Sequence, residues 1–405
     1  MRVAIVGAGF TGLAAGLELS RRGAGVTIFE QRDKVGGLAV GFRRPEWKWT
    51  AEKFYHHIFT NDRAIIKLSR ELGIEPEWHR PVTAVYYSRE EGRGKREEGE
   101  FRQFDSAKDL LMFPELGLID KLRMGAVLAG LKILPNGRFL EKYCAKDWLI
   151  KMIGKKGFET VWEPLLSGKF VDLASEVNMA WFWARIKKRT VRLGTFPGGF
   201  QALAERMADE IKKSGGEIIL NKKAEINSLL GKYEVVLSTM PARNGKVNYL
   251  DAHVLFLELA RQFLPDIYWL NILDRRFPFL VLGEHTNFVP RKNFGSSHLV
   301  YVGNYLPPDH RLFSLSSNEV LDEFFPWLKK IRPDFSRRDI LNAWVFRGRF
   351  AQPVMTVNYS KLIPAIKREE NLYVANQAMI YPWDRGTNYA VELGQRAAGL
   401  IMNDL

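Results

Sequence analysis

The chain has 405 residues, 46% of them hydrophobic and 26% charged, and this length exceeds the roughly 300 residues at which a single hydrophobic core stops growing, so two domains are expected. The single cysteine, Cys144, excludes a disulfide framework, a CxxC redox pair and a thiolate cluster, and the His and acidic residues show no metal-binding spacing. The net charge of +14 fits an anionic substrate, anionic lipid headgroups, nucleic acid or a heat-adapted surface, and so selects none of them.

Two stretches bear on cellular location. Met1 is followed directly by a strand pattern, without the charged and then apolar leader of a secreted protein, so a cytoplasmic location is expected. The nearest candidate for a membrane span, residues 124–134, is shorter than about 18 residues and contains Lys132. A span is not expected, whereas peripheral membrane contact stays open. Nucleic-acid binding, which only the net charge favours, is not expected.

The first elements form one βαβ unit. Residues 2–6 predict a buried strand, 11–22 a helix and 25–30 a second strand, and the crossover helix makes the two strands parallel.

The turn between the first strand and the helix has the sequence GAGFTG. Gly7 permits a tight turn, Gly9 lets the backbone approach a pyrophosphate, and Gly12 lets the helix pack close to the strand. The helix N-terminus presents unpaired N–H groups to the phosphates, so Phe10 and Thr11 complete this part of the candidate cofactor site.

The identity of the dinucleotide follows from the next segment. Glu30 ends the second strand 18 residues after Gly12, where it can accept hydrogen bonds from a ribose 2′-OH, which argues against NADP. NAD and FAD both remain after that step. Gly36 and Gly37 supply a second close backbone approach, which a dinucleotide lying extended across the sheet can use.

The following segments differ in their sequence patterns from the first unit. Residues 50–62 follow the second glycine turn, and 81–104 predict two antiparallel strands around a solvated charged turn. Residues 106–192 are mainly helical, and 246–350 mix strands with a polar helix near 317–330.

Two later segments again show an α/β sequence pattern. Residues 197–221 predict a helix that ends at Gly215 and Gly216, and 233–241 a buried strand. The last unit has a strand at 372–376 and an amphipathic helix from about 388 to 402, for which Thr387 or Asn388 is a suitable N-cap. The simplest assembly is a nucleotide-binding domain in three pieces (1–80, 193–245 and 351–405) and a second domain inserted twice (81–192 and 246–350).

These motifs together resemble the flavin-containing amine oxidase superfamily, which includes protoporphyrinogen oxidases and carotenoid desaturases. The segments PGGFQAL, NKKAEINSL and NLYVANQAMIYPWDRGTNYAVELGQRAA extend the similarity over most of the chain. The resemblance implies an α/β fold, namely a Rossmann-like FAD-binding domain (GR2-type) with an inserted α+β substrate domain that has a mixed sheet plus a helical part. FAD is the implied cofactor.

The resemblance also implies further cofactor contacts. It places Gln31 and Leu38 beside the two turns, a strand near Ala224 against the adenine, and Asp384, Thr387 and Asn388 near the flavin. Two departures stand out. The family usually has Arg or Lys where this chain has Leu38, and an acidic residue after the last strand where this chain has Asn376-Gln377, so that the acidic contact falls to Asp384 or is absent.

Candidate catalytic residues lie in 50–62, which should run beside the flavin ring. Tyr55, His56 and His57 are the candidates, because a neutral imidazole can take a proton or orient a carboxylate near pH 7. The alternative is that one histidine is hydrogen-bonded in the core and the other exposed.

The candidate substrate segments are 162–172 and 179–194, which combine Trp and Phe with five basic residues between 185 and 192. These segments either wall an apolar pocket with a cationic mouth, touch a membrane, or form a core with a solvated charged face. The favoured function is an FAD-dependent oxidase or desaturase that removes a hydride from a C–N or C–C site of an apolar, anionic small molecule such as a porphyrinogen or isoprenoid.

Two other functions occur on the same fold. A non-redox flavoenzyme resembling UDP-galactopyranose mutase would act on a sugar nucleotide only after reduction of the flavin. A non-catalytic escort protein of the Rab-inhibitor type would need no intact dinucleotide turn, so Gly7, Gly9, Gly12 and Glu30 argue against it. The sequence does not predict an oligomeric state.

Overall fold

The structure is a computed structural model that describes residues 1–88, 99–241 and 245–404. The chain divides into two compact units. Unit 1 contains Met1–Trp78, Leu193–Val247 and Ser360–Leu405, and unit 2 contains His79–Arg192 and Asn248–Tyr359.

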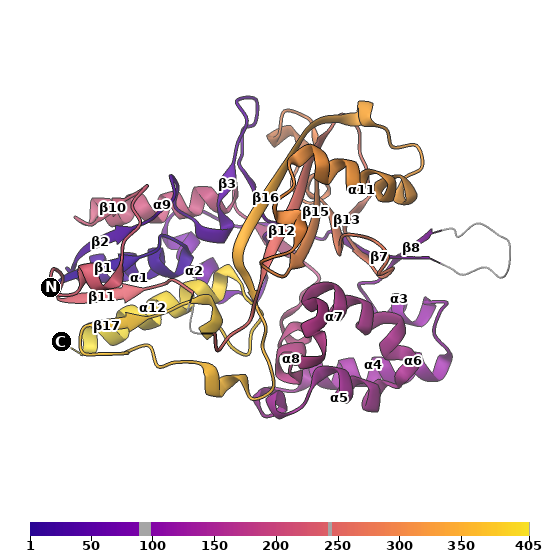
Figure 1. Ribbon diagram of the computed structural model, residues 1–405, viewed down its shortest axis with the longest axis horizontal. Coiled ribbons are helices and arrows are strands. Elements are labelled where there is room, and N and C mark those ends of the chain that lie inside the picture. The colour runs from indigo at the N-terminus through magenta and orange to yellow at the C-terminus, as the bar shows by residue number, and fades with distance from the viewer. Residues whose placement is uncertain (89–98, 242–244, 405) are drawn as a thin grey trace. The chain divides into compact units, whose positions relative to one another are not determined.

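Unit 1 is built on a parallel sheet of five strands (Figure 1). The strand order is β10 (Glu217–Ile219), β2 (Gly25–Phe29), β1 (Arg2–Val6), β11 (Val235–Ser238) and β17 (Leu372–Val374). The strands come from three separate stretches of the chain, and the β1–α1–β2 crossover forms as expected. This sheet with its helices confirms the predicted α/β, Rossmann-like fold.

Helices cover this sheet because each has one apolar face. They are α1 (Phe10–Arg21), α2 (Arg63–Glu71), α9 (Gly199–Lys213) and α12 (Thr387–Asn403). In α9 the residues Leu203, Met207 and Ile211 repeat at helical spacing, and all three are fully buried in the unit 1 core. The sheet face and the helices thus share one core.

Short elements follow the second glycine turn. The 3₁₀ turn η1 (Gly37–Ala39) leads to β3 (Gly41–Phe42), which pairs with β4 (Ala51–Glu52). A three-stranded sheet joins β5 (Ile58–Phe59), β9 (Leu193–Thr195) and β6 (Glu77–His79).

The expectation of a strand at Ala224 is wrong. Ala224 lies in an irregular segment between β10 and the short helix α10 (Ile226–Leu229). The Lys222 N–H nevertheless donates to the Glu30 carbonyl at 2.8 Å, which ties this segment to the end of β2 without a strand.

Unit 2 contains the predicted mixed sheet. Its order is β16 (Ile340–Pro353), β12 (Tyr249–Leu259), β15 (His298–Leu306), β14 (Val281–Glu284), β13 (Ile267–Ile272), β7 (Val82–Ser88) and β8 (Gly99–Gln103). Strands β13 and β7 are parallel and the other pairs are antiparallel. The expected β7–β8 hairpin is present, and its charged turn lies outside the described residues.

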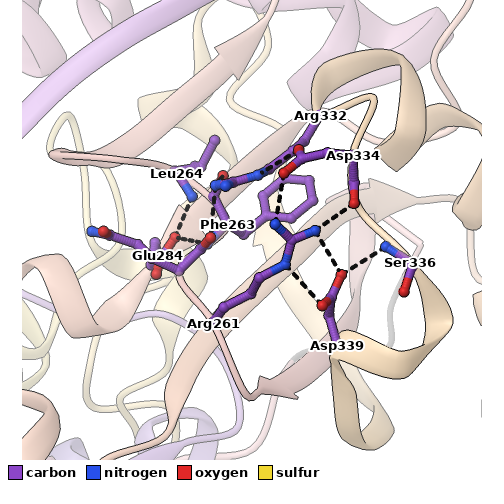
Figure 2. Close-up of polar contacts among 9 residues, drawn as sticks. Arg261, Phe263, Leu264, Glu284, Arg332, Asp334, Ser336 and Asp339 are labelled. Atoms are coloured by element: carbon purple, nitrogen blue, oxygen red, sulfur yellow. Dashed lines mark hydrogen bonds and ion pairs between the residues drawn. The ribbon is translucent and has the colours of Figure 1, made fainter.

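Helix α11 (Ser317–Ile331) packs on this sheet. It begins with a capping box between Ser316 and Glu319, and its buried face, Val320, Phe324 and Leu328, joins the core of the sheet. The loop after α11 is fixed by Arg261, which follows β12 and binds Asp334 and Asp339 (Figure 2). This ion-pair network ties that loop to the end of β12.

The rest of unit 2 is helical, as predicted. Its helices are α3 (Ala107–Met112), α4 (Leu118–Ile133), α5 (Ala145–Ile153), α6 (Lys155–Gly157), α7 (Glu163–Phe170) and α8 (Met179–Lys188). Trp181, Phe182 and Trp183 on α8 are buried, which favours the core interpretation of these aromatic residues. Lys187 at the end of α8 donates to the Lys132 and Ile133 carbonyls, so it caps α4.

Candidate cofactor site

The first glycine turn connects β1 to α1 at one end of the unit 1 sheet. A Cβ on Gly12 would lie 2.0 Å from the Gly7 carbonyl oxygen, so only glycine allows the helix to start this close to the turn. The first intrahelical bond runs from the Leu13 N–H to the Gly9 carbonyl at 2.9 Å. The N–H groups of the first helical turn therefore have no acceptor inside the helix, which suits a phosphate.

Phe10 contributes to this turn only through its backbone. Its side chain is buried, and its ring meets the Phe200 ring edge-on with centroids 6.3 Å apart. Thr11 is half-buried at the next position.

Glu30 lies directly after β2, beside this turn. One carboxylate oxygen accepts from the Ala8 N–H at 2.9 Å and the other from the Arg32 N–H at 3.0 Å. The side chain is buried, whereas the neighbouring Gln31 is exposed. Each carboxylate oxygen can accept a second hydrogen bond, so Glu30 remains able to bind ribose hydroxyls while it holds the turn.

The second glycine turn touches the first. The Gly36 N–H donates to the Ala8 carbonyl at 2.8 Å. Gly37 has φ +62°, and a Cβ on it would lie 3.0 Å from Gly9 Cα. Any side chain there would fill the space between the two backbones. The half-buried Leu38 follows in η1.

These observations fit the ADP half of a dinucleotide. The two turns form a backbone cradle, the start of α1 favours negative charge, and Glu30 supplies acceptors for a ribose.

The strand that pairs with β3 carries a buried carboxyl group that the sequence did not indicate. Glu52 on β4 accepts a hydrogen bond from the Phe200 N–H at 2.7 Å, at the start of α9. Burial raises the pKa of Glu52 to about 7, and the Phe200 hydrogen bond partly opposes that rise.

Gln201 connects the same helix to β3, the strand that follows the second glycine turn. Its Oε1 accepts from the Gly41 N–H at 3.0 Å, and Gly41 is the residue of β3 that pairs with Glu52 on β4. Sequence patterns gave no signal for Glu52 or Gln201, because their partners lie about 150 residues away.

The structure fixes the state of one candidate catalytic histidine. His56 Nδ1 lies 2.7 Å from the Phe54 carbonyl oxygen, and its ring lies 5.6 Å from the Phe200 ring. Burial lowers the pKa of His56 to about 4, partly opposed by the Phe54 carbonyl, and Arg385 lowers it further. His56 is therefore neutral near pH 7, with the proton on Nδ1 and an acceptor lone pair on Nε2.

The other two candidates are less constrained. His57 packs its ring against Phe59, with centroids 5.3 Å apart, and Tyr55 is half-buried. The alternative of one core and one exposed histidine does not hold, since His56 and His57 are both half-buried.

The predicted N-cap of the last helix is wrong. Helix α12 begins at Thr387 with Gly386 as its N-cap, and no side chain caps it. Asn388 instead directs its Oδ1 to the N–H groups of Ala64 and Ile65 at 2.9 and 3.2 Å. The carboxamide of Asn388 is thus engaged in holding α2, and the start of α12 offers backbone N–H groups to a ligand.

Asp384 lies in the loop before α12. One of its carboxylate oxygens accepts from the Arg385 N–H at 3.1 Å. Trp383 stacks on Tyr389, with ring centroids 5.6 Å apart and planes 3° from parallel, which ties this loop to the first turn of the helix.

Two features are absent from the described residues. No group of three or more His, Cys, Asp or Glu side chains there could hold a metal ion. None of the helices in the same residues combines the length and apolar character needed to cross a membrane.

Comparison with known proteins identifies the family. The sequence profile of the family "Flavin containing amine oxidoreductase" matches residues 10–239. A 15-cis-phytoene desaturase from Synechococcus elongatus is 21% identical over 338 residues, which cover 78% of this chain and 69% of the desaturase. A chloroplastic protoporphyrinogen oxidase from Nicotiana tabacum is 24% identical over 204 residues, which cover 50% of this chain. Three of the curated relatives align over only 15% to 35% of their own length.

Solved structures share the fold. An oxidoreductase from Methanosarcina mazei superposes with a TM-score of 0.72 at 16% identity, and the match covers all of both chains. A reduced UDP-galactopyranose mutase superposes with a TM-score of 0.72 at 12% identity over 99% of this chain and 95% of that one.

The fold and the double glycine turn define an α/β protein of the dinucleotide-binding class. Since the family profile covers more than half of its length, the chain belongs to the flavin-containing amine oxidoreductase family.

Proposed function

We propose that this chain is an oxidase or desaturase that uses FAD to remove a hydride, or its equivalent, from a C–N or C–C site of an apolar substrate with anionic groups, such as a porphyrinogen or an isoprenoid. The observation that carries the proposal is the contact between Gly9 and Gly37 beside the buried Glu30, which suits an extended dinucleotide. The substrate class draws support from the alignment of a phytoene desaturase over 78% of the chain.

In this proposal, unit 1 holds FAD and unit 2 contacts the substrate. The backbone at the two turns binds the pyrophosphate, Glu30 binds the ribose, and the start of α12 lies toward the flavin. The residues assigned to the cofactor are Gly7, Gly9, Phe10, Thr11, Gly12, Glu30, Gln31, Gly36, Gly37, Leu38, Ala224, Asp384, Thr387 and Asn388. FAD, when bound, supplies the acceptor for the hydride.

The substrate side is assigned to Tyr55, His56 and His57. His56 is suited to accept a proton or a hydrogen bond at Nε2, because the Phe54 carbonyl holds the proton on Nδ1. Because the imidazole is neutral near pH 7, it places no positive charge beside an apolar substrate.

A small apolar substrate also agrees with a peripheral position at a membrane. We include such contact in the proposed function, because an apolar molecule of this class partitions into lipid.

Rapid mixing under anaerobic conditions tests the reaction class. Purified holoprotein is mixed with a porphyrinogen, a C40 isoprenoid in detergent, or a diamine, and the flavin absorbance near 450 nm is followed. Bleaching by the porphyrinogen or the isoprenoid, slowed in His56→Phe, is expected. Bleaching by the diamine alone would overturn the substrate class.

A second candidate is a non-redox enzyme on a sugar nucleotide, favoured by the fold shared with a UDP-galactopyranose mutase over 99% of this chain. It requires cations for a diphosphate, and Lys187, one of the five basic residues between 185 and 192, already caps α4. Turnover of UDP-galactopyranose by the dithionite-reduced protein only, with none by the oxidised protein, would select this function.

A further inference from the structure

The outer face of helix α4 in unit 2 is apolar and exposed. Leu118, Ile119, Leu122 and Ile133 are 68%, 74%, 57% and 77% exposed. At 100° per residue, positions 118, 119, 122 and 133 fall within about 100° of the helix circumference, so they form one stripe. We name this set the α4 stripe.

The α4 stripe is distinct from the side of α4 that packs in the core. The core side of the same helix is formed by Met124 and Leu131, which are 0% and 4% exposed. A helix that is apolar on its inner and outer sides is normally covered on both. Helix α4 is therefore built to meet something outside the chain.

Exposed apolar residues gather around this stripe. Fifteen large apolar side chains are exposed in the described part of the chain, and nine of them lie within residues 107–152. Leu111 and Met112, at the end of α3, are 50% and 72% exposed, and Phe139, just after α4, is 58% exposed. Such a concentration marks an interaction surface.

The charges around the stripe have predominantly one sign. Among exposed residues between 107 and 152, seven are basic and one, Asp147, is acidic. The basic residues are Lys108, Arg123, Lys132, Arg138, Lys142, Lys146 and Lys151. Arg123 donates to the Lys151 and Met152 carbonyls at the end of α5, which positions its charge without neutralising it.

We propose that the α4 stripe, with the ends of α3 and η2 (Arg138–Lys142) beside it, is a docking face for an anionic bilayer surface. An apolar stripe bordered by Lys and Arg is the pattern by which a helix lies in the headgroup region, with its apolar side in the acyl boundary. A second copy of the chain would bring this predominantly basic surface against an identical one, which disfavours that occupant.

This inference rests on the membrane contact included in the proposed function, and it assigns that contact to particular residues. The test is flotation of the purified full-length holoprotein with vesicles of phosphatidylglycerol and phosphatidylcholine, or of phosphatidylcholine alone, at low salt and at about 0.5 M salt. Flavin absorbance of each preparation is recorded before flotation, so that a loss of cofactor is distinguished from a loss of binding.

The wild type is expected to float with the anionic vesicles, and high salt should weaken binding. Ile119→Ser combined with Leu122→Ser should weaken it by roughly tenfold or more, because the apolar insertion is lost. Leu341→Ser on β16, which is 51% exposed in wild type, is the matched control and should leave binding unchanged. Lys142→Glu combined with Lys146→Glu tests the basic residues around the α4 stripe and should weaken binding to anionic vesicles, as high salt does.

Equal binding by the double serine variant and the wild type would overturn the proposal. A wild type that binds neither vesicle type would also overturn it. So would a wild type that forms a dimer and binds no vesicles, if the double serine variant is a monomer that also binds none. Vesicle binding by a protein that takes up no flavin would contradict the proposed function and leave the docking face intact.

Discussion

The side chain of Asn388 accepts a hydrogen bond from the N–H of Ala64 at 2.9 Å, across 324 residues of sequence. It also accepts from Ile65 at 3.2 Å, so the last helix of the chain supplies the N-terminal cap of α2. Asp62, the residue preceding α2, directs one carboxylate oxygen to the Phe59 N–H at 2.8 Å. The cap of α2 therefore depends on α12 being in place.

Replacing Asn388 by Ala should lower the free energy of unfolding by about 1–2 kcal/mol, because two N–H groups of α2 lose their acceptor. Denaturant unfolding of the flavin-free protein measures the change. Glu392→Gln is the control, because it alters the group that accepts from the Asn388 amide and leaves the cap intact. Equal losses in the two variants would show that the cap contributes nothing.

Glu30→Ala should weaken FAD binding by roughly 10- to 100-fold, since it removes charged acceptors for the ribose. Glu30→Gln keeps an acceptor for the Ala8 N–H and should lose less. Titration of the apoprotein with FAD, followed by flavin fluorescence, gives both dissociation constants. Unchanged affinity in Glu30→Ala, with a folded apoprotein, would remove Glu30 from the site.

Gly37→Ala should reduce flavin binding sharply, because the new Cβ would press on Gly9 Cα at 3.0 Å and separate the two turns. Gly73→Ala is the matched control. Gly73 has a similar backbone angle, φ +77°, but its Cβ would meet nothing within 4 Å. Both variants carry the strain of a positive φ, so only the loss specific to Gly37 reports on the cradle. Flavin content per chain after purification is the measurement.

Glu52 should make stability depend on pH. Its folded pKa of about 7 is above the ordinary 4.5, so its contribution to stability is full below pH 4.5 and is lost as the pH rises to about 7. The loss is about 3 kcal/mol. Glu52→Gln keeps an acceptor for the Phe200 N–H and lacks this titration. The difference in unfolding free energy between variant and wild type should therefore grow in favour of the variant between pH 4.5 and 7, and a difference that stays constant would contradict the assignment.

Local patterns sufficed for the first turn and the fold class. The turn at Gly7, Gly9 and Gly12 lies where a strand pattern meets a helix pattern, and Glu30 follows at the end of the next strand, so nearby residues determine the geometry. The family assignment followed from the same residues together with the C-terminal segment.

Distant partners explain what the sequence did not reveal. Asn388 was expected to cap its own helix, but Ala64 and Ile65 compete for its carboxamide, and nothing near position 388 indicates them. In the sequence nothing distinguishes Glu52 from the other acidic residues. Its burial arises only in the fold, where β4 pairs with β3 and α9 covers it. The segment at Ala224 keeps its place beside β2 through one backbone hydrogen bond from Lys222 rather than through strand pairing.

The visible absorption spectrum of the purified protein tests the central claim most directly. We expect the bands of oxidised flavin at about one FAD per chain, bleached by anaerobic reduction with dithionite and restored by air or an added electron acceptor. A colourless protein that takes up no added FAD would contradict the flavin site at the two glycine turns.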